Sequence, residues 1–241
     1  MRVLVTNDDG IDAPGLEALA SALSEDWDAY VVAPSGHCSG TGHALTLYRD
    51  LSVEKRGDRS WCVGGTPADC VKLAIGELLG VRPDVVVSGI NPGPNMANNV
   101  HYSGTIAAAS EAAFWNIPSI AVSSGSQTPR HLGCTGSYVR KLLLAGVHRL
   151  IPRSCVLSLN IPDLPLRELG QPVWTRTARF SADAPFIVLD PGRSYRYGRM
   201  PDPTLTDPSG TDVEALKAGL VSATLLGLDR SLPGFDLPPI G

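Results

Sequence analysis

The 241-residue chain has no run of Lys or Arg and no long apolar segment. Its formal net charge is −4, so it lacks the basic stripe that marks an extended nucleic-acid groove. No segment approaches the ~20 apolar residues that a membrane-spanning helix needs. The N-terminus enters a strand-like segment at once and has no signal-peptide layout. These absences argue against binding to a nucleic-acid polymer and against insertion into a membrane.

Cysteine is scarce and irregularly spaced. The chain has five, never in CxxC pairs, at Cys38, Cys62, Cys70, Cys134 and Cys155. This pattern argues against a disulfide framework or a zinc ribbon and favours the reducing cytoplasm. We therefore expect a cytoplasmic protein.

Up to about residue 160, strand-like and helix-like patterns alternate. The strand-like segments are Arg2–Thr6, Ala29–Ala33, Val85–Ser88, Ser119–Ser123 and Cys155–Ile161, and the helical patterns are Pro14–Leu23, Ala68–Leu79, Thr105–Trp115 and Ser137–Leu150. Alternation with short loops predicts βαβ units, right-handed crossovers and a three-layer, doubly wound, mostly parallel α/β sheet. Two short strand-like runs between Thr46 and Val63 predict an appended β-hairpin.

The length suits a single α/β domain over residues 1–241, with a core at about 1–165 and a C-terminal extension at about 166–241. Asp190–Asp212 is rich in Pro, Gly, Tyr and Arg, and its Tyr195 and Tyr197 suit a packed subunit contact. A helix to about Ala218 and a strand-like Leu220–Leu226 follow. The apolar tail after them, residues 232–240, needs a docking surface, which a neighbouring subunit would supply.

Two adjacent carboxylates, Asp8 and Asp9, follow the first strand-like segment. They stand in the turn Asn7–Gly10, ahead of the helical pattern that starts at Pro14. Ligands of open α/β sheets bind at the carboxyl ends of the strands, so this order predicts a site at the turn. Two like charges held together are costly unless a cation or a proton lies between them. We favour the cation.

Further loops at the same predicted edge offer oxygen ligands. The second strand-like segment is followed by a loop with Ser39, and the third by a loop with Asn91. If these strands neighbour the first, Ser39 and Asn91 meet Asp8 and Asp9 in one crevice. Carboxylate, hydroxyl and amide oxygens suit one Mg²⁺ or Mn²⁺ per subunit, and the absence of His and thiolate ligands argues against zinc.

An anion pocket is predicted beside this cation. Ser103, Gly104 and Thr105 precede an Ala-rich helix, whose first N–H groups and dipole favour an anion. Asn95 can donate from the opposite loop. A hard cation next to an anion pocket is what hydrolysis of a phosphate ester requires. One of the two carboxylates would orient or deprotonate the attacking water.

Taken singly, these residues suit structural roles. The acidic and Asn residues suit turns, and Ser103 or Thr105 suits an N-cap. His43 and His101 suit hydrogen-bonded structural positions, and Lys72 suits a solvated helix face. Only the joint placement at one sheet edge favours a site.

Several motifs, in this order and spacing, resemble those of the SurE (survival protein E) family of metal-dependent 5′/3′-nucleotidases. They are Thr6–Ile11, Ala13–Gly15, Gly42–Thr46, Gly65–Leu73, Val87–Asn91 and Tyr102–Thr105. The resemblance covers Met1 to about Ser124 and continues weakly at Asn160–Pro162 and Gly210–Asp212.

The resemblance implies a doubly wound core with a C-terminal arm used in homodimer or homotetramer assembly. It implies metal ligation by Asp8, Asp9, Ser39 and Asn91, and phosphate binding by Asn95 and Ser103–Thr105. The implied reaction is hydrolysis of nucleoside 5′- and 3′-monophosphates to nucleoside and phosphate, with an exopolyphosphatase side activity. The chain departs from the family at Ser35–Cys38 and Ala97–Asn99, where charged residues are common. Both departures remove charge from the mouth of the site.

Two other classes of protein compete with this interpretation. A phospho-receiver signalling module also binds Mg²⁺ through paired carboxylates. It requires a phospho-acceptor Asp at the end of a central strand, where this chain has Ser88, and it is about half this length. A dinucleotide-binding oxidoreductase would need a GxGxxG turn after the first strand, where this chain has Asn7–Gly10.

Overall fold

A computed structural model describes residues 1–179, 186–197 and 209–231 of the chain. None of the helices in these ranges is long and apolar enough to cross a membrane. The apolar tail for which a docking surface was predicted lies outside the described residues.

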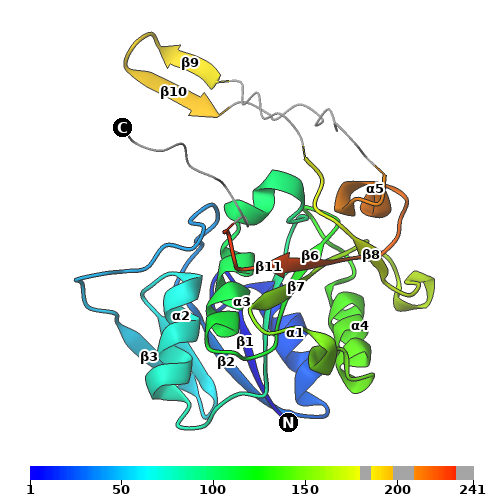
Figure 1. The fold of residues 1–241 in the computed structure, drawn as a ribbon. Coiled ribbons are helices and arrows are strands. Elements are labelled where there is room, and N and C mark those ends of the chain that lie inside the picture. The colour runs from blue at the N-terminus through cyan, green and yellow to red at the C-terminus, as the bar shows by residue number, and fades with distance from the viewer. Residues whose placement is uncertain (180–185, 198–208, 232–241) are drawn as a thin grey trace, which may run out of the picture.

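The predicted mostly parallel α/β sheet is confirmed (Figure 1). In the described part of the chain it has nine strands in the order β3-β4-β2-β1-β5-β6-β7-β11-β8. Their bounds are β1 Arg2–Thr6, β2 Asp28–Pro34, β3 Val53–Gly57, β4 Ser60–Val63, β5 Val85–Asn91, β6 Ser119–Ser124, β7 Cys155–Ile161, β8 Val173–Thr175 and β11 Ser222–Gly227. The antiparallel pairs are β3 with β4 and β11 with β7. The predicted hairpin is therefore β3–β4, added at one edge of the sheet.

Helices cover both faces of the sheet. They are α1 Pro14–Ser24, α2 Pro67–Leu73, α3 Gly104–Phe114, α4 Leu132–Leu144 and α5 Asp212–Lys217, with a π-helical turn η1 Ala74–Leu78 and 3₁₀ turns η2 Ala97–His101, η3 Val147–Leu150 and η4 Leu166–Glu168. A separate antiparallel hairpin, β9 Phe186–Asp190 with β10 Ser194–Tyr197, stands away from the sheet in Figure 1.

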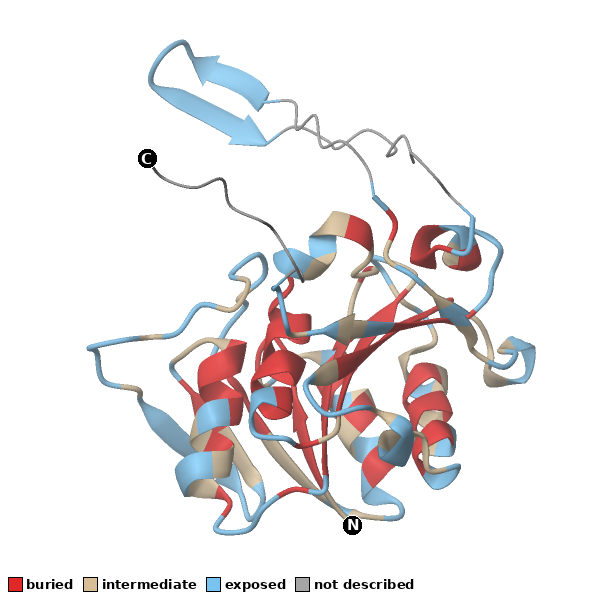
Figure 2. Ribbon diagram, viewed as in Figure 1, coloured by how far each residue is buried: buried red, intermediate tan, exposed pale blue. Residues whose placement is uncertain are grey.

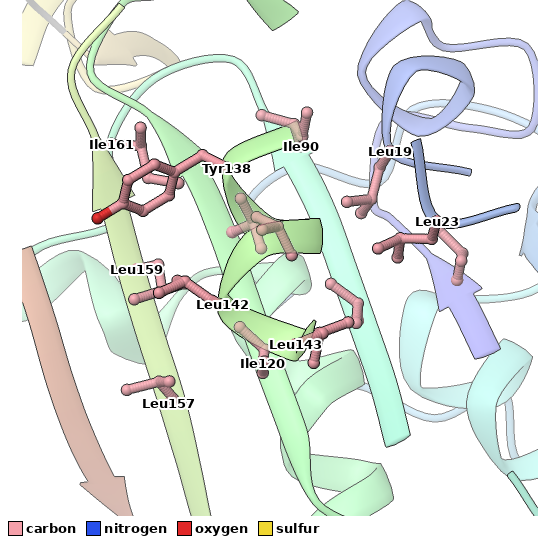
Figure 3. Packing of buried hydrophobic residues seen from close by; sticks show 14 of the residues in the cluster. Leu19, Leu23, Ile90, Ile120, Tyr138, Leu142, Leu143, Leu157, Leu159 and Ile161 are labelled. Atoms are coloured by element: carbon pink, nitrogen blue, oxygen red, sulfur yellow. The ribbon is translucent and has the colours of Figure 1, made fainter. Parts of the chain in front are cut away.

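The alternation of side chains along β1 divides the core into two. Val3 belongs to one core cluster with residues of α1 and α4 such as Leu19 and Leu142, whose side chains are labelled in Figure 3. Leu4, its neighbour, packs on the opposite face with α2 and α3, for example with Ala108. Successive residues of a strand point to opposite faces. Because β1 is buried on both faces of the sheet, its sequence is an unbroken apolar run and does not alternate between apolar and polar residues (Figure 2).

The expectation that every crossover is right-handed is wrong for one of them. β5 to β6 and β6 to β7 step in the same direction along the sheet. α3, which joins the first pair, lies on the face with α2, whereas α4, which joins the second, lies on the face with α1. Two such connections have opposite hands. The connections through α1, α2 and α3 all have the same hand. Because right-handed crossovers are strongly preferred, this shared hand is the right-handed one, and β6-α4-β7 is the left-handed exception. α4 thereby covers the face that α1 alone would leave open.

Two predicted helices differ from the observed ones. The helix predicted over Ser137–Leu150 begins earlier, as α4, and is interrupted at Gly146, whose φ of 83° is left-handed. Glycine in this conformation ends helices. The helix predicted over Ala68–Leu79 continues from α2 into the π-helical turn η1.

The last part of the chain returns to the sheet. β11 pairs with β7, and β8 pairs with β11, so both extend the edge beyond β7. β8 has three residues, too few for a periodic pattern, and was not predicted. β10 lies within the segment that was predicted to be irregular. The division into a core at about 1–165 and an extension at about 166–241 stays a prediction.

The contact between α1 and β5 leaves no room for a side chain at Gly15. A β-carbon there would lie 2.1 Å from the carbonyl oxygen of Ile90. We expect Gly15→Ala to lower the free energy of unfolding by about 1–3 kcal/mol, because α1 must move off the sheet. The measurement is urea unfolding followed by circular dichroism. Gly133→Ala in α4, whose β-carbon would meet nothing within 4 Å, is the control and should cause no loss. Equal effects of the two substitutions would contradict the close approach.

Candidate active site at the carboxyl edge of the sheet

The turn after β1 is closed by the side chain of Asn7. Its Nδ2 donates to the Gly10 carbonyl oxygen at 3.0 Å, and its Oδ1 accepts from the Gly10 N–H at 3.2 Å. Gly10 has a φ of 111°, a conformation that L side chains rarely adopt. Asn7 and Gly10 thus form a rigid frame that presents Asp8 and Asp9 at the edge of the sheet.

Asp8 is buried and joins three segments of the chain. The Thr105 hydroxyl donates to its Oδ1 at 2.6 Å, and the Cys38 N–H donates to its carbonyl oxygen at 2.7 Å. A β-carbon at Gly104 would lie 2.7 Å from the Asp8 β-carbon, so only glycine allows the start of α3 to approach this closely. The loop after β2 and the first turn of α3 therefore both contact the residue after β1.

Asp9 has a buried carboxylate oxygen that lacks a partner. Its Oδ1 lies 3.3 Å from His37 Nδ1, whereas its Oδ2 forms no hydrogen bond to any described residue. Burial, with a further contribution from the charge of Asp8, raises the pKa of Asp9 to about 6. Burial raises the pKa of Asp8 as well. An unsatisfied anionic oxygen beside a second carboxylate fits a hard cation.

Ser39 lies in the loop after β2 and Asn91 at the end of β5, and these two strands flank β1, as predicted. Asn91 is the last residue of β5, and its Nδ2 donates to the Gly93 carbonyl oxygen at 2.7 Å, which leaves Oδ1 without a hydrogen bond to the described residues. Ser39 is exposed and follows Cys38, whose N–H is bonded to Asp8. No cluster of three or more His, Cys, Asp or Glu side chains within the described ranges is arranged to hold a metal. Neutral oxygens such as those of Ser39 and Asn91 would have to complete a cation site. The ligand set therefore stays a prediction.

Three of the predicted phosphate-binding residues, Ser103–Thr105, lie at the start of α3 next to Asp8. Ser103 caps α3, accepting from the Ile106 N–H at 3.2 Å, so the structural role considered for it is real. Gly104 and Thr105 are buried in the first turn of α3, where helix geometry leaves N–H groups without helical acceptors. The arrangement permits anion binding there, and this role also stays a prediction.

Asn95 is held by residues that the sequence did not single out as site residues. Its Nδ2 donates to the Ser123 hydroxyl at 3.0 Å, at the end of β6. Its N–H donates to the side-chain oxygen of Asn160 at 2.9 Å, and the Asn160 amide donates back to its carbonyl oxygen at 3.2 Å. Asn160 is buried at the end of β7, so the loop that carries Asn95 is fixed from two neighbouring strands.

Asp212 fixes the segment that follows Asn95. Its buried carboxylate accepts from the Ala97 N–H and from the Ala178 N–H, both at 2.9 Å. Asn160 and Asp212 belong to the two weak motifs near the C-terminal end. Their order in the sequence gave no indication of this role, because both contacts join residues far apart in the chain.

Glu111 of α3 anchors the loop that carries Ser39. Its carboxylate lies 3.2 Å from His43 Nε2 and 3.0 Å from Lys72 Nζ, and it accepts from Trp115 Nε1 at 3.2 Å. Burial opposes the charge of Glu111, but the bonds from His43 and Lys72 outweigh it and lower its pKa below the ordinary 4.5. The structural role predicted for His43 is confirmed. Lys72 is not merely solvated, since it pairs with Glu111.

Two clefts border this region. The first, here called the Asp9 cleft, has a volume of about 600 Å³ and is lined by residues 9–15, 35–37, 90, 92, 127–129 and 132. The second, here called the Ser103 cleft, has about 930 Å³ and is lined by residues 43, 97–98, 100–101, 103, 106–107, 110, 114, 177–179 and 225–231. The Asp9 cleft lies beside α1 and α4, and the Ser103 cleft lies along α3.

Paired carboxylates at the carboxyl edge of a doubly wound sheet, next to a helix N-terminus, define an α/β protein with an oxygen-rich candidate site. A family model described as Survival protein SurE matches residues 3–183, and the chain belongs to this family. It is 42% identical over 232 residues to 5′-nucleotidase SurE of Geobacter metallireducens, covering 95% of this chain and 92% of that protein. It is also 42% identical over 232 residues to 5′-nucleotidase SurE of Geobacter sulfurreducens, covering 95% of this chain and 88% of that protein.

A solved structure shows the same fold. The crystal structure of SurE protein from Aquifex aeolicus matches with a TM-score of 0.85 and 34% identity, covering 96% of this chain and 95% of that one. The similarity extends over almost the whole of both chains, so it includes the sheet edge where the carboxylates lie.

The Glu111 cluster predicts a pH-dependent contribution to stability. Because its pKa is lower in the folded protein, ionised Glu111 stabilises the fold above pH 4.5, and this contribution is lost as the pH falls through the lowered pKa. We expect Glu111→Gln to reduce the free energy of unfolding by about 1–3 kcal/mol at pH 7 and by less at lower pH. Urea unfolding from pH 7 to pH 3 measures the difference. The exposed Glu77→Gln serves as control, and a pH-independent effect of Glu111→Gln would refute the assignment.

Proposed function

We propose that this protein is a divalent-metal-dependent nucleotidase that hydrolyses nucleoside 5′- and 3′-monophosphates to nucleoside and phosphate. Relatives at 42% identity carry the name 5′-nucleotidase over nearly the whole chain. The observation that carries the proposal is the buried Asp9 Oδ2, which has no hydrogen-bond partner among the described residues and lies beside Asp8. A cation paired with phosphate would satisfy it.

The cation is Mg²⁺ or Mn²⁺, held by Asp8, Asp9, Ser39 and Asn91. All four offer oxygen, the ligand type that these metals prefer. When bound, the ion supplies Lewis-acid stabilisation of the phosphoryl oxygens and makes water a better nucleophile. Asp8, held in place by Thr105, and Asp9, held beside His37, orient the attacking water.

The phosphate binds at the first turn of α3 and at Asn95. The N–H groups and dipole of α3 favour the phosphate charge at Ser103–Thr105. Asn95 keeps one position because Ser123 and Asn160 hold both its side chain and its backbone. Donors held rigidly before the substrate arrives stabilise developing charge without the cost of reorganisation. The same site accepts the end of a short polyphosphate, which would give the exopolyphosphatase side activity.

The competing signalling module is less well supported. Its acceptor carboxylate would have to stand near the end of β5, where Ser88 is fully buried and offers no carboxylate. The name 5′-nucleotidase of the relatives also favours the hydrolase. The cytoplasmic location is proposed as well, and all five cysteines are free thiols, which suits a reducing compartment.

Removal of the metal tests the proposal directly. We expect EDTA to abolish phosphate release from AMP, and Mg²⁺ or Mn²⁺ to restore it. Asp9→Asn should lower kcat by about 10²-fold or more while circular dichroism stays normal, because one negative charge of the ligand pair is lost. The control is Asp58→Asn in the exposed β3–β4 turn. Full activity in EDTA or in Asp9→Asn would rule out the metal assignment.

We also propose that the protein is a homodimer or homotetramer assembled through the β9–β10 hairpin. Every described residue of the hairpin is exposed, including six large apolar or aromatic side chains (Figure 2): Phe186, Ile187, Val188, Leu189, Tyr195 and Tyr197. An isolated two-stranded hairpin is only marginally stable in water. A second copy of the chain would cover this surface and stabilise the hairpin.

A charge placed on the hairpin tests the assembly. Val188, which pairs with Tyr195 across the hairpin, is 55% exposed. We expect Val188→Lys to reduce the mass in solution toward that of a monomer, since a buried unpaired charge disfavours association. Light scattering after gel filtration measures the mass. Val53→Lys on the edge strand β3, where valine is 43% exposed, is the matched control. An unchanged oligomer in Val188→Lys would count against the hairpin.

A further inference from the structure

The substrate of the proposed reaction needs room for a nucleoside next to its phosphate. The ester oxygen joins the two directly, so the nucleoside must lie in a cleft that borders the phosphate site. Asp9 lines the Asp9 cleft, and Ser103 lines the Ser103 cleft. These clefts lie on the two sides of the Asp8–Asp9 pair, toward α1 and toward α3.

We propose that the Asp9 cleft binds the nucleoside of the substrate, with the base among apolar side chains and the ribose at Asp12. This inference rests on the proposed nucleotidase function and adds a specificity site to it. The cleft volume of about 600 Å³ lies within the range of roughly 300–1,000 Å³ that is usual for small-molecule sites.

One wall of the Asp9 cleft is apolar. Ile90 and Pro92 come from the end of β5, and Pro129 and Leu132 come from the loop after β6 and the start of α4. Ile90 is fully buried and belongs to the main core, so it backs this wall, and the accessible apolar surface comes from the half-buried Pro92, Pro129 and Leu132. Rigid apolar surfaces bind the faces of a planar base and exclude water from it.

Polar groups at the mouth match the edges of a nucleoside. Asp12 and Gln127 line the cleft and form no hydrogen bond to another described residue. A carboxylate accepts hydrogen bonds from ribose hydroxyls, as in dinucleotide sites. An amide both donates and accepts, which suits the edge of a base. Gln127 is placed by its contact with Gly93, where a β-carbon would lie 2.3 Å from Gln127 Nε2.

The Ser103 cleft is less suited to a base. Its described lining includes the charged residues Arg179, Asp229 and Arg230. Charged groups favour a second anion or solvent over a planar apolar ring. The carboxylates that line the Asp9 cleft are Asp9, which belongs to the proposed cation site, and the exposed Asp12, which is assigned to the ribose. Neither occupies the apolar wall formed by Pro92, Pro129 and Leu132.

The first test compares two substrates that differ only in the base. AMP and ribose 5-phosphate present the same phosphate and sugar. We expect Gln127→Ala to lower the ratio of kcat/KM for AMP to that for ribose 5-phosphate by about 3- to 10-fold, the value of one hydrogen bond. Gly36→Leu should lower the same ratio, because a side chain there starts in open space at the cleft and would fill it. Gly76→Leu, also in open space but far from the site, is the matched control.

The second test concerns the ribose. If Asp12 accepts from the 2′-hydroxyl, the wild-type protein should prefer AMP to 2′-deoxy-AMP, and Asp12→Ala should remove this preference. A purely structural effect of the substitution would lower both activities together and leave their ratio unchanged, which would refute the role of Asp12.

The outcomes separate the inference from the function on which it rests. If the wild-type protein releases phosphate from neither AMP nor ribose 5-phosphate, the proposed function itself fails. If it hydrolyses AMP but Gln127→Ala and Gly36→Leu leave the substrate ratio unchanged, only the assignment of the Asp9 cleft is overturned. His101→Ala probes the other cleft. If His101→Ala alone lowered activity on AMP relative to ribose 5-phosphate, the nucleoside would bind in the Ser103 cleft. This result would also overturn the proposal.

Discussion

The structure of the site depends on the contacts that Asp8 makes with two other segments. The Thr105 hydroxyl bonds to its side chain and the Cys38 N–H bonds to its backbone, so the ends of β1 and β2 and the start of α3 are fixed relative to one another. Each segment carries part of the proposed site. Gly104 allows the approach because any side chain there would collide with Asp8. The buried Asp8 and the partly buried Asp9 remain adjacent even though burial raises the pKa of each, which is an arrangement that a bound cation would stabilise.

The site residues are held by parts of the chain that take no direct part in it. Asn160 and Asp212 bind the backbone on either side of Met96, and Glu111 binds His43 in the loop after β2. These anchors are buried, whereas Ser39 is exposed. A rigid scaffold that carries exposed loop residues is the usual division between stability and function in α/β proteins. It also gives the motifs around Asn160 and Asp212, which carry no evident chemistry, a structural role in this chain.

The placement of α4 links the fold to the proposed specificity. Because the β6-α4-β7 crossover is left-handed, α4 lies beside α1, and Leu132 at its start closes one side of the Asp9 cleft. A right-handed crossover would have placed α4 beside α3 and left that side open. In this view, the phosphate is bound on the α3 side of the carboxylate pair and the nucleoside on the α1 side. The exception to the crossover rule thus creates the second wall of the proposed nucleoside site.

The sequence alone determined the sheet, most of its strands and the edge where the acidic turn lies, because apolar periodicity and turn residues are local signals. Arg2–Thr6 and Cys155–Ile161 agree with β1 and β7 to the residue. The family also followed from the order of short motifs. The tertiary structure alone decided the hand of the α4 crossover and the pairing of Lys72 with Glu111. It also decided the hydrogen bonds by which Asn160 and Asp212 hold the loop that carries Asn95. These depend on contacts between residues 39 to 115 positions apart, and no local pattern encodes which distant partner a buried polar group will find.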